Sequence, residues 1–137
     1  MQLIDDRTGL ERLGREECLD RLRGAQVGRL AVVSASRPLI FPVNYAMDGE
    51  AVVFRTAPGT KFDGAVREMA VAFEIDEFDV ERREGWSVLV TGRAEEVVSE
   101  AHRHGVARLF DATAQRGRPV EFVGIVLRPP DLAVRKV

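Results

Sequence analysis

Residues 39–61 have the sequence LIFPVNYAMDGEAVVFRTAPGTK, and the architecture of the chain follows from this hairpin. Apolar side chains alternate with others from Leu39 to Met47, which predicts a strand with one buried face. Asp48-Gly49 predicts a two-residue turn, because both residue types tolerate the positive φ angles that such turns need. Ala51–Thr56 is apolar and β-branched, so we expect it to be the partner strand.

The loop after this hairpin carries two cations and two hydroxyl groups, from Arg55, Thr56, Thr60 and Lys61. A phosphate monoester needs such donors, since arginine can bind it bidentately and lysine acts as a point charge. If a helix begins at Thr60 or Lys61, its free N–H groups would face the same anion. The alternative is that the cations are solvated loop charges and the threonines are turn and capping residues. The string RTAPGTK alone does not decide between the two.

Strands dominate the rest of the sequence. Val27–Ser34 is a predicted strand that turns back at Ser36–Pro38, and the longest predicted strand is Gly85–Val97. Further strands are expected at residues 69–78, 119–127 and 132–136, the last two separated by Pro129-Pro130, and short helices at 14–24, 61–69 and 99–110. Six or seven strands with short connections favour a mainly β fold, a closed or nearly closed antiparallel barrel.

Composition limits the classes of function. The chain has 137 residues and 45% hydrophobic content, enough for one domain over residues 1–137. Its 20 basic and 22 acidic residues give no basic excess for nucleic acid, and no apolar run is long enough to cross a membrane. The single cysteine, Cys18, and a charged N-terminus without a signal peptide indicate a soluble cytoplasmic protein. His102 and His104 lie on different helix faces, so no metal site is expected.

Three strings in series resemble one known family: PVNYAMDGEAVVFRTAPGTK at 42–61, VAFEIDEFD at 71–79 and GWSVLVTGRAEEV at 85–97. They are similar to the pyridoxamine 5′-phosphate oxidase-like family of flavin-binding split barrels, in particular to its shorter bacterial members. The resemblance covers roughly residues 18–127. It implies a six-stranded antiparallel split β-barrel with short flanking helices. It also implies a homodimer with flavin mononucleotide (FMN) in each of two clefts at the subunit interface.

The resemblance also implies which residues hold the cofactor. The phosphate anchors correspond to Arg55, Thr56, Thr60 and Lys61, the strand along the flavin ring to Pro42, Val43 and Asn44, and the residues near the cofactor or the partner subunit to Trp86 and Ser87. The residues alone leave alternatives open. The Asn44 amide either reaches a ring edge or is satisfied by the neighbouring turn. Trp86 covers the flavin, lies in the dimer interface or packs in the core. For Tyr45 we expect core packing with an exposed hydroxyl.

The function implied is an FMN-dependent oxidoreductase that acts on an unknown small organic substrate, with unknown catalytic residues, since flavin chemistry belongs to the cofactor. The tail GRPVEFVGIVLRPPDLAVRKV lacks the Arg-x-His segment of the true oxidase, so oxidation of pyridoxamine phosphate is not expected. Two alternatives keep the fold: a reductase that uses the 5-deazaflavin coenzyme, and a flavin-binding module without enzymatic activity.

Overall fold

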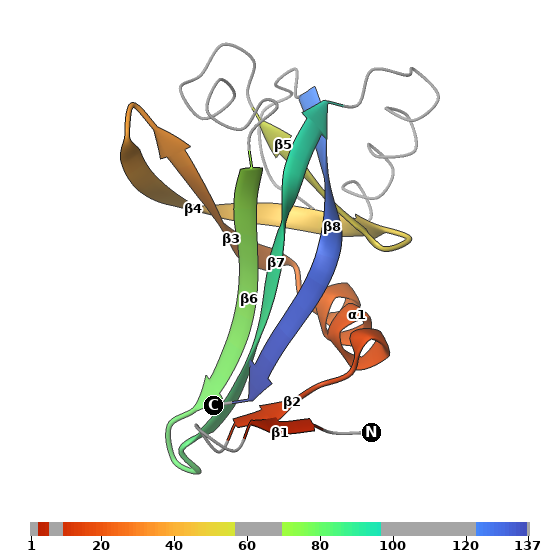
Figure 1. Cartoon of the computed structure of the whole chain (residues 1–137), viewed down its shortest axis with the longest axis vertical. Coiled ribbons are helices and arrows are strands. Elements are labelled where there is room, and N and C mark those ends of the chain that lie inside the picture. The colour runs from red at the N-terminus through yellow and green to blue at the C-terminus, as the bar shows by residue number, and fades with distance from the viewer. Residues whose placement is uncertain (1–2, 6–9, 57–69, 97–122, 137) are drawn as a thin grey trace.

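The computed structural model describes residues 3–5, 10–56, 70–96 and 123–136. These residues form eight strands and one helix (Figure 1). In chain order the elements are β1 Leu3–Asp5, β2 Leu10–Arg12, α1 Arg15–Gly24, β3 Val27–Ser34, β4 Arg37–Asp48, β5 Ala51–Thr56, β6 Ala70–Asp79, β7 Glu84–Glu96 and β8 Val123–Lys136. No helix among the described residues is long and apolar enough to cross a membrane.

Six of the strands close into an antiparallel barrel in the order β3-β4-β5-β8-β7-β6, and β6 completes the ring by pairing with β3. The predicted six-stranded antiparallel barrel is therefore confirmed. β1 and β2 form a separate two-stranded sheet. Figure 1 shows β6, β7 and β8 as long neighbouring strands, with α1 beside β8. The helices expected at 61–69 and 99–110 lie outside the described residues.

Side chains alternate between the two faces of each strand, and those on the inner face fill the interior of the barrel. The buried side chains that line it are Leu30, Val32, Val43, Tyr45, Val52, Phe54, Val71, Phe73, Ile75, Val88 and Val90. β5 departs from the pattern, because Val53 is as fully buried as Val52 and Phe54 on either side of it. Both faces of β5 are therefore covered.

Gly28 on β3 leaves room for the buried ring of Phe73. A Cβ atom at this position would lie 2.2 Å from Cζ of Phe73 and 2.5 Å from its Cε2 atom. The Phe73 ring in turn meets Tyr45 edge-on, with 4.8 Å between ring centroids and 70° between ring planes. The missing side chain thus creates the space for an aromatic pair at the centre of the barrel.

The helix α1 packs on the barrel through Cys18, Leu19 and Leu22, which are all buried, as their spacing predicts. Acidic residues in its first turn and basic residues in its last turn suit the helix dipole. The Tyr45 hydroxyl donates a hydrogen bond to the Leu22 carbonyl and is buried, so the expectation of an exposed hydroxyl was wrong. Burial raises the pKa of Tyr45, which therefore acts as a neutral donor that ties the helix to the core.

The turns of both hairpins lie about one residue away from the positions that the sequence predicted. β3 and β4 are joined by Ala35 and Ser36, with φ angles of 49° and 63°, and not by residues 36–38. Positive φ at both central residues is the signature of a type I′ turn, whose twist suits a hairpin even without glycine. The second turn is Gly49-Glu50, since Asp48 still pairs with Ala51. Of the two turn residues only Gly49 has positive φ, 59°, as in a type II′ turn.

Pro129-Pro130 does not break the last strand as expected. β8 continues through both prolines, and its register with β7 shifts there: Thr91 pairs with Asp131, but Arg93 pairs with Arg128. One β7 residue, Gly92, thus faces two residues of β8, which is a β-bulge. Proline has no N–H to donate and is tolerated at such a bulge, where pairing is interrupted anyway.

Candidate functional site

The barrel sheet has an outer face that extends from β4 across β3 and β6 to β7. The register aligns Pro42 with Arg29, Arg29 with Glu74, and Glu74 with Leu89, so these four residues form one row across the four strands. The outer face consists of Pro38, Ile40, Pro42, Asn44, Val27, Arg29, Ala31, Val33, Ala70, Ala72, Glu74, Asp76, Ser87, Leu89, Thr91 and Arg93. Exposed apolar side chains are frequent on it, with Val27, Val33 and Ile40 each more than half exposed.

Two of the three residues predicted to line a flavin ring lie on this face. Pro42 and Asn44 are exposed and stand two residues apart on β4. Val43, between them, points into the barrel and is 8% exposed. Only its backbone can therefore contact a ligand on the outer face.

The two residues predicted on β7 lie on opposite sides of the sheet. Ser87 is on the outer face and half-buried. Trp86 packs against the core, and its ring lies 4.5 Å from the Arg21 guanidinium carbon. Arg21 also pairs with Glu17 at 3.1 Å, while its buried Nε has no hydrogen-bond partner among the described residues. The cation–π contact with Trp86 compensates the positive charge of the Arg21 guanidinium and holds α1 on the barrel.

The predicted phosphate anchors are only partly within the described residues. Arg55 and Thr56 belong to β5, where they pair with Gly124 and Val123 of β8, and the structure describes their backbone alone. Position 55 follows Phe54, whose partner on β4 is Tyr45. Strand alternation therefore places position 55 on the same side of the sheet as Asn44. Thr60 and Lys61 lie outside the described residues.

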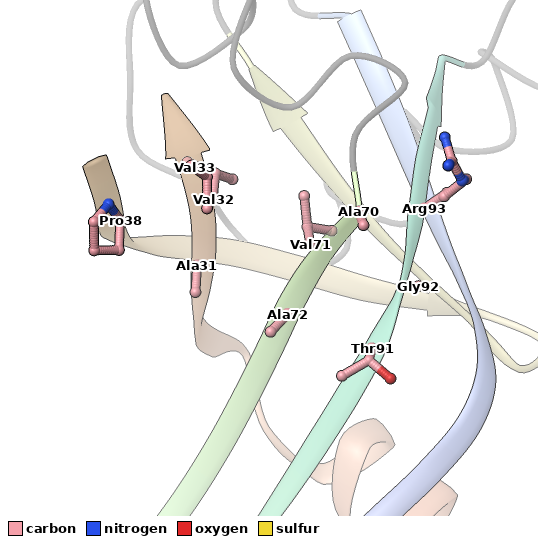
Figure 2. Close-up of a pocket in the computed structure, with 10 residues that line it drawn as sticks. All are labelled: Ala31, Val32, Val33, Pro38, Ala70, Val71, Ala72, Thr91, Gly92 and Arg93. Atoms are coloured by element: carbon pink, nitrogen blue, oxygen red, sulfur yellow. The ribbon is translucent and has the colours of Figure 1, made fainter. Parts of the chain in front are cut away.

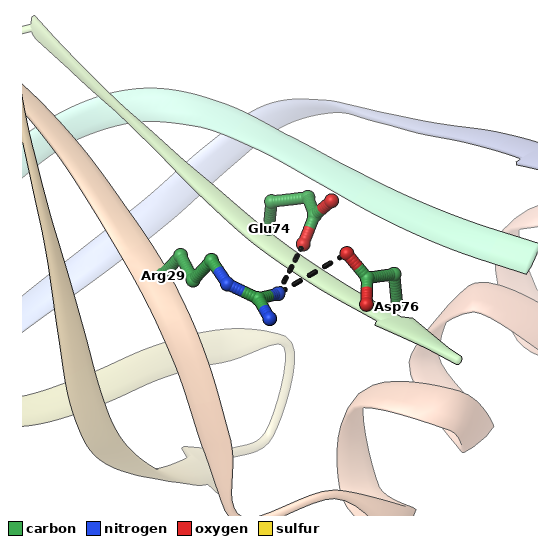
Figure 3. A network of polar contacts seen from close by, with 3 residues as sticks. All are labelled: Arg29, Glu74 and Asp76. Atoms are coloured by element: carbon green, nitrogen blue, oxygen red, sulfur yellow. Dashed lines mark hydrogen bonds and ion pairs between the residues drawn. The ribbon is translucent and has the colours of Figure 1, made fainter. Parts of the chain in front are cut away.

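A charged cluster stands in the middle of the outer face. Arg29 donates to Glu74 at 3.3 Å and to Asp76 at 3.1 Å (Figure 3). Partial burial and the neighbouring Asp76 carboxylate raise the pKa of Glu74, and Arg29 opposes this effect. Two carboxylates two residues apart on a strand share a face, so the spacing of Glu74 and Asp76 indicates this cluster in the sequence.

Next to this cluster the outer face is hollowed into a groove of about 650 Å³. Figure 2 shows that its lining comes from β3, the start of β4, the start of β6 and the middle of β7. Its lining is mostly apolar and consists of Ala31, Val32 and Val33 from β3, Pro38 from β4, Ala70, Val71 and Ala72 from β6, and Thr91, Gly92 and Arg93 from β7. This groove could not be predicted from the sequence, because it depends on how four strands are aligned.

A family model described as pyridoxamine 5′-phosphate oxidase matches residues 14–131. The chain belongs to this family. The match begins just before α1 and extends to the bulge in β8, so it includes the whole barrel except the last residues of β8. All nine residues that the resemblance pointed to lie within it.

Relatives of known structure share the fold over almost the whole chain. A FAD-binding protein from Mycobacterium smegmatis is 32% identical, covers 92% of this chain and 98% of its own, and has a TM-score of 0.77. A FAD-binding protein from Mesorhizobium loti, 23% identical, has the same TM-score of 0.77, with coverage of 93% of this chain and 98% of its own. The uncharacterized protein Rv0080 of Mycobacterium tuberculosis is 41% identical over 90 residues, 62% of this chain. The match spans 59% of that protein's length.

In this member of the pyridoxamine 5′-phosphate oxidase family the predicted residues form two groups. Pro42, Asn44 and Ser87 share the outer face, and position 55 joins them by register. Trp86 and the side chain of Val43 face the core instead. The outer face can therefore offer a ligand an exposed sheet surface and the carboxamide of Asn44.

Proposed function

We propose that this protein is an FMN-dependent oxidoreductase, a single cytoplasmic domain that works as a homodimer on a small organic substrate. FMN would lie on the outer face between two subunits. The observation that carries the proposal is that Pro42, Asn44 and Ser87 share one exposed sheet face within the barrel of this family.

The chemistry of this face fits a flavin. An isoalloxazine ring is flat and apolar, with carbonyl and N–H groups along one edge. Pro42 supplies a flat apolar contact, and the exposed Asn44 amide has both a donor and an acceptor for the ring edge. The phosphate would be held by Arg55, Thr56, Thr60 and Lys61, since strand alternation places position 55 on the same side of the sheet as Asn44. The bound flavin supplies electron transfer, while the protein binds it, orients it and excludes water.

The dimer supplies the second wall of this site. The outer face exposes Val27, Val33 and Ile40, and burying such side chains against a second copy is favourable. Trp86 faces the core of its own subunit, so its role would be to support Ser87 and α1 at the seam where the partner subunit approaches the cofactor.

FAD is a second candidate for the cofactor. The M. smegmatis relative is named a FAD-binding protein and is 32% identical over 92% of this chain. FAD and FMN share the ring and the first phosphate, so the same outer face suits both. The adenosine half of FAD would need a further surface.

Cofactor binding tests the proposal directly. We expect the purified protein to show a flavin spectrum in visible light, or to quench the fluorescence of added FMN or FAD. Titration of the apoprotein with FMN, FAD and the 5-deazaflavin coenzyme ranks the three. A colourless protein that quenches neither flavin contradicts the proposal, and tighter binding of the deazaflavin would identify that coenzyme instead. Turnover with NADH or NADPH and a panel of acceptors separates an enzyme from a binding module.

Variants test the assigned residues. Each lost charge-assisted contact costs about 1.5–3 kcal/mol, so Arg55→Ala with Lys61→Ala should weaken FMN binding by at least about a hundredfold. Asn44→Ala should cost less, about 0.5–1.5 kcal/mol, because a neutral hydrogen bond is lost. Arg82→Ala is the control, since Arg82 is exposed in the turn between β6 and β7. Equal affinity of the double variant and the control would place the phosphate elsewhere.

A further inference from the structure

The exposed apolar surface of the described residues is concentrated on the outer face. Six large apolar side chains are exposed in this part of the chain, and the sixth, Val80, lies in the turn between β6 and β7. Exposed apolar side chains are normally scattered singly, so a concentration of them marks a contact surface. The five on the outer face, which Phe78 extends along β6 two residues beyond Asp76, are Val27, Val33, Ile40, Phe78 and Leu89.

Phe78 projects from this face in a fixed position. It is 56% exposed, yet its ring lies across Gly85, its register partner on β7. A Cβ atom at Gly85 would lie 2.7 Å from Cδ2 of Phe78. A ring that is already held in place loses little freedom when it binds, and aromatic side chains are enriched in protein interfaces.

The groove lies at the other end of β6. Ala70 and Ala72 of β6 line it, with Val33 of β3 and Gly92 of β7 beside them (Figure 2). Ala70 is exposed, so small side chains border a hollow of about 650 Å³. One end of the outer face is therefore hollow and apolar, and the other end projects an apolar ring.

The two ends are equally far from the centre of the face, where Glu74 pairs with Arg29 (Figure 3). Ala70 and Phe78 are each four residues from Glu74 on the same side of β6, which is roughly 13 Å. A two-fold axis that lies between two such faces and runs across the strands at Glu74 would place the Phe78 ring of each copy over Ala70 of the other. The contact is self-complementary, as a two-fold dimer requires.

The size of this surface suits a stable dimer. The face is four strands wide, and the contact extends along β6 from Ala70 to Phe78. With strands about 4.8 Å apart and a rise of about 3.3 Å per residue, two such faces cover roughly 1,000 Å² in total, which reaches the size of a specific interface. Glu74 and Asp76 are already paired with Arg29, which lowers the cost of burying their charges.

From this arrangement we propose that a second copy of the chain docks on the outer face by inserting its Phe78 into the groove, reciprocally across one two-fold axis. The inference rests on the proposed homodimer and adds the residues that hold the two copies together. Ala70 and Ala72 receive the ring. The flavin proposed at Pro42 and Asn44 lies on β4, beside this contact.

Sedimentation and light scattering of the apoprotein over a range of concentrations test the inference. Phe78→Ala should raise the dissociation constant of the dimer about tenfold or more, since an anchoring aromatic contact is lost twice in each dimer. Val80→Ala is the matched control, because Val80 is 76% exposed in the same hairpin but lies in its turn. Its dissociation constant should equal that of the wild type.

Ala70→Leu tests the groove side of the contact. Ala70 is exposed, so the larger side chain is compatible with the fold, and it should weaken the dimer by filling the hollow. In the double variant Phe78→Ala with Ala70→Leu, the leucine takes the space that the ring leaves. The loss of affinity should then be smaller than the two single losses combined, because the two residues are in contact.

Two results would overturn the inference while the wild type is a dimer. Phe78→Ala could dimerise as well as Val80→Ala, or the effects of the Phe78 and Ala70 substitutions could be fully additive. Both would leave the proposed flavin site untouched, because flavin binding is read separately from the visible spectrum. A colourless protein that dimerises as described would contradict the flavin and not this contact, whereas a monomeric wild type would remove the contact together with the proposed dimer.

Discussion

At the scale of single residues, Gly28 has the most demanding surroundings among the described glycines. Besides the Phe73 ring, a Cβ atom there would meet the Glu74 carbonyl oxygen at 3.0 Å. Phe73 is fully buried and packs against Tyr45, so its ring has no exposed position to move to. The requirement for glycine here is one of space, since the φ angle of Gly28 is not in the positive range.

Gly28→Ala should therefore lower the free energy of unfolding by about 1–3 kcal/mol, the usual cost of overpacking a core. Urea unfolding measures this, and Phe73→Leu in the same chain should recover part of the loss by shortening the ring. Gly24→Ala is the control: nothing lies within 4 Å of a Cβ atom there, at the end of α1. A Gly28→Ala variant as stable as this control would contradict the packing described.

The same scale shows why part of the candidate site could be predicted. Asn44 shares a face with Ile40, Pro42 and Ala46, which strand alternation alone predicts from the sequence. The side chain of Val43 faces the other way for the same reason. Trp86 could not be resolved from the sequence, since its environment depends on Arg21, which is distant in the chain.

At the scale of elements, the turn between β3 and β4 is the weakest local match between sequence and structure. Ala35 and Ser36 both adopt positive φ, a conformation that costs L-residues roughly 1–2 kcal/mol each. Asparagine followed by glycine is the pair that type I′ turns prefer. The absence of this pair explains why the sequence predicted the turn one residue too late, close to Pro38.

Ala35→Asn with Ser36→Gly should raise the free energy of unfolding by about 1 kcal/mol or more, measured by urea unfolding. Glu50→Gly is the matched control in the other hairpin. Glu50 does not have positive φ, so glycine there should bring only the entropic loss and the loss of its exposed ion pair with Arg15. Equal effects at both turns would show that backbone strain at Ala35 and Ser36 is not the cause.

Most strands were predictable and their irregularities were not. The bounds of β3 and β5 agree with the sequence expectation, because each is a short apolar run between turn residues. β8 was expected as two strands, since two prolines usually end one, and only its neighbour β7 shows that a bulge absorbs them. The β1–β2 hairpin was missed because strands of three residues carry almost no periodic signal.

At the scale of the whole molecule, the outer face is the surface through which two copies would meet. We expect light scattering to give twice the 15.2 kDa of one chain. Ile40→Asp should shift the protein toward the monomer, because Ile40 is 69% exposed in the centre of the apolar part of this face. A flavin-loaded sample should lose cofactor in parallel.

Val80→Asp is the control for this prediction, since Val80 is 76% exposed but lies in the turn between β6 and β7. It should leave the mass unchanged. A wild-type protein that remains monomeric at all concentrations would contradict the dimer, and a dimer that tolerates Ile40→Asp would place the interface on another surface.

The position of β8 has a consequence for the order of folding. On one side β5 pairs with β4, and β7 pairs with β6, in each case the strand just before it in the chain. The other edges of β5 and β7 pair with β8, the last strand in the sequence. Thr56 must find Val123 across a long intervening segment, and the entropy of closing such a loop makes this pairing slow. Until then two unpaired edges are open to other chains. During synthesis, aggregation would compete with this final closure.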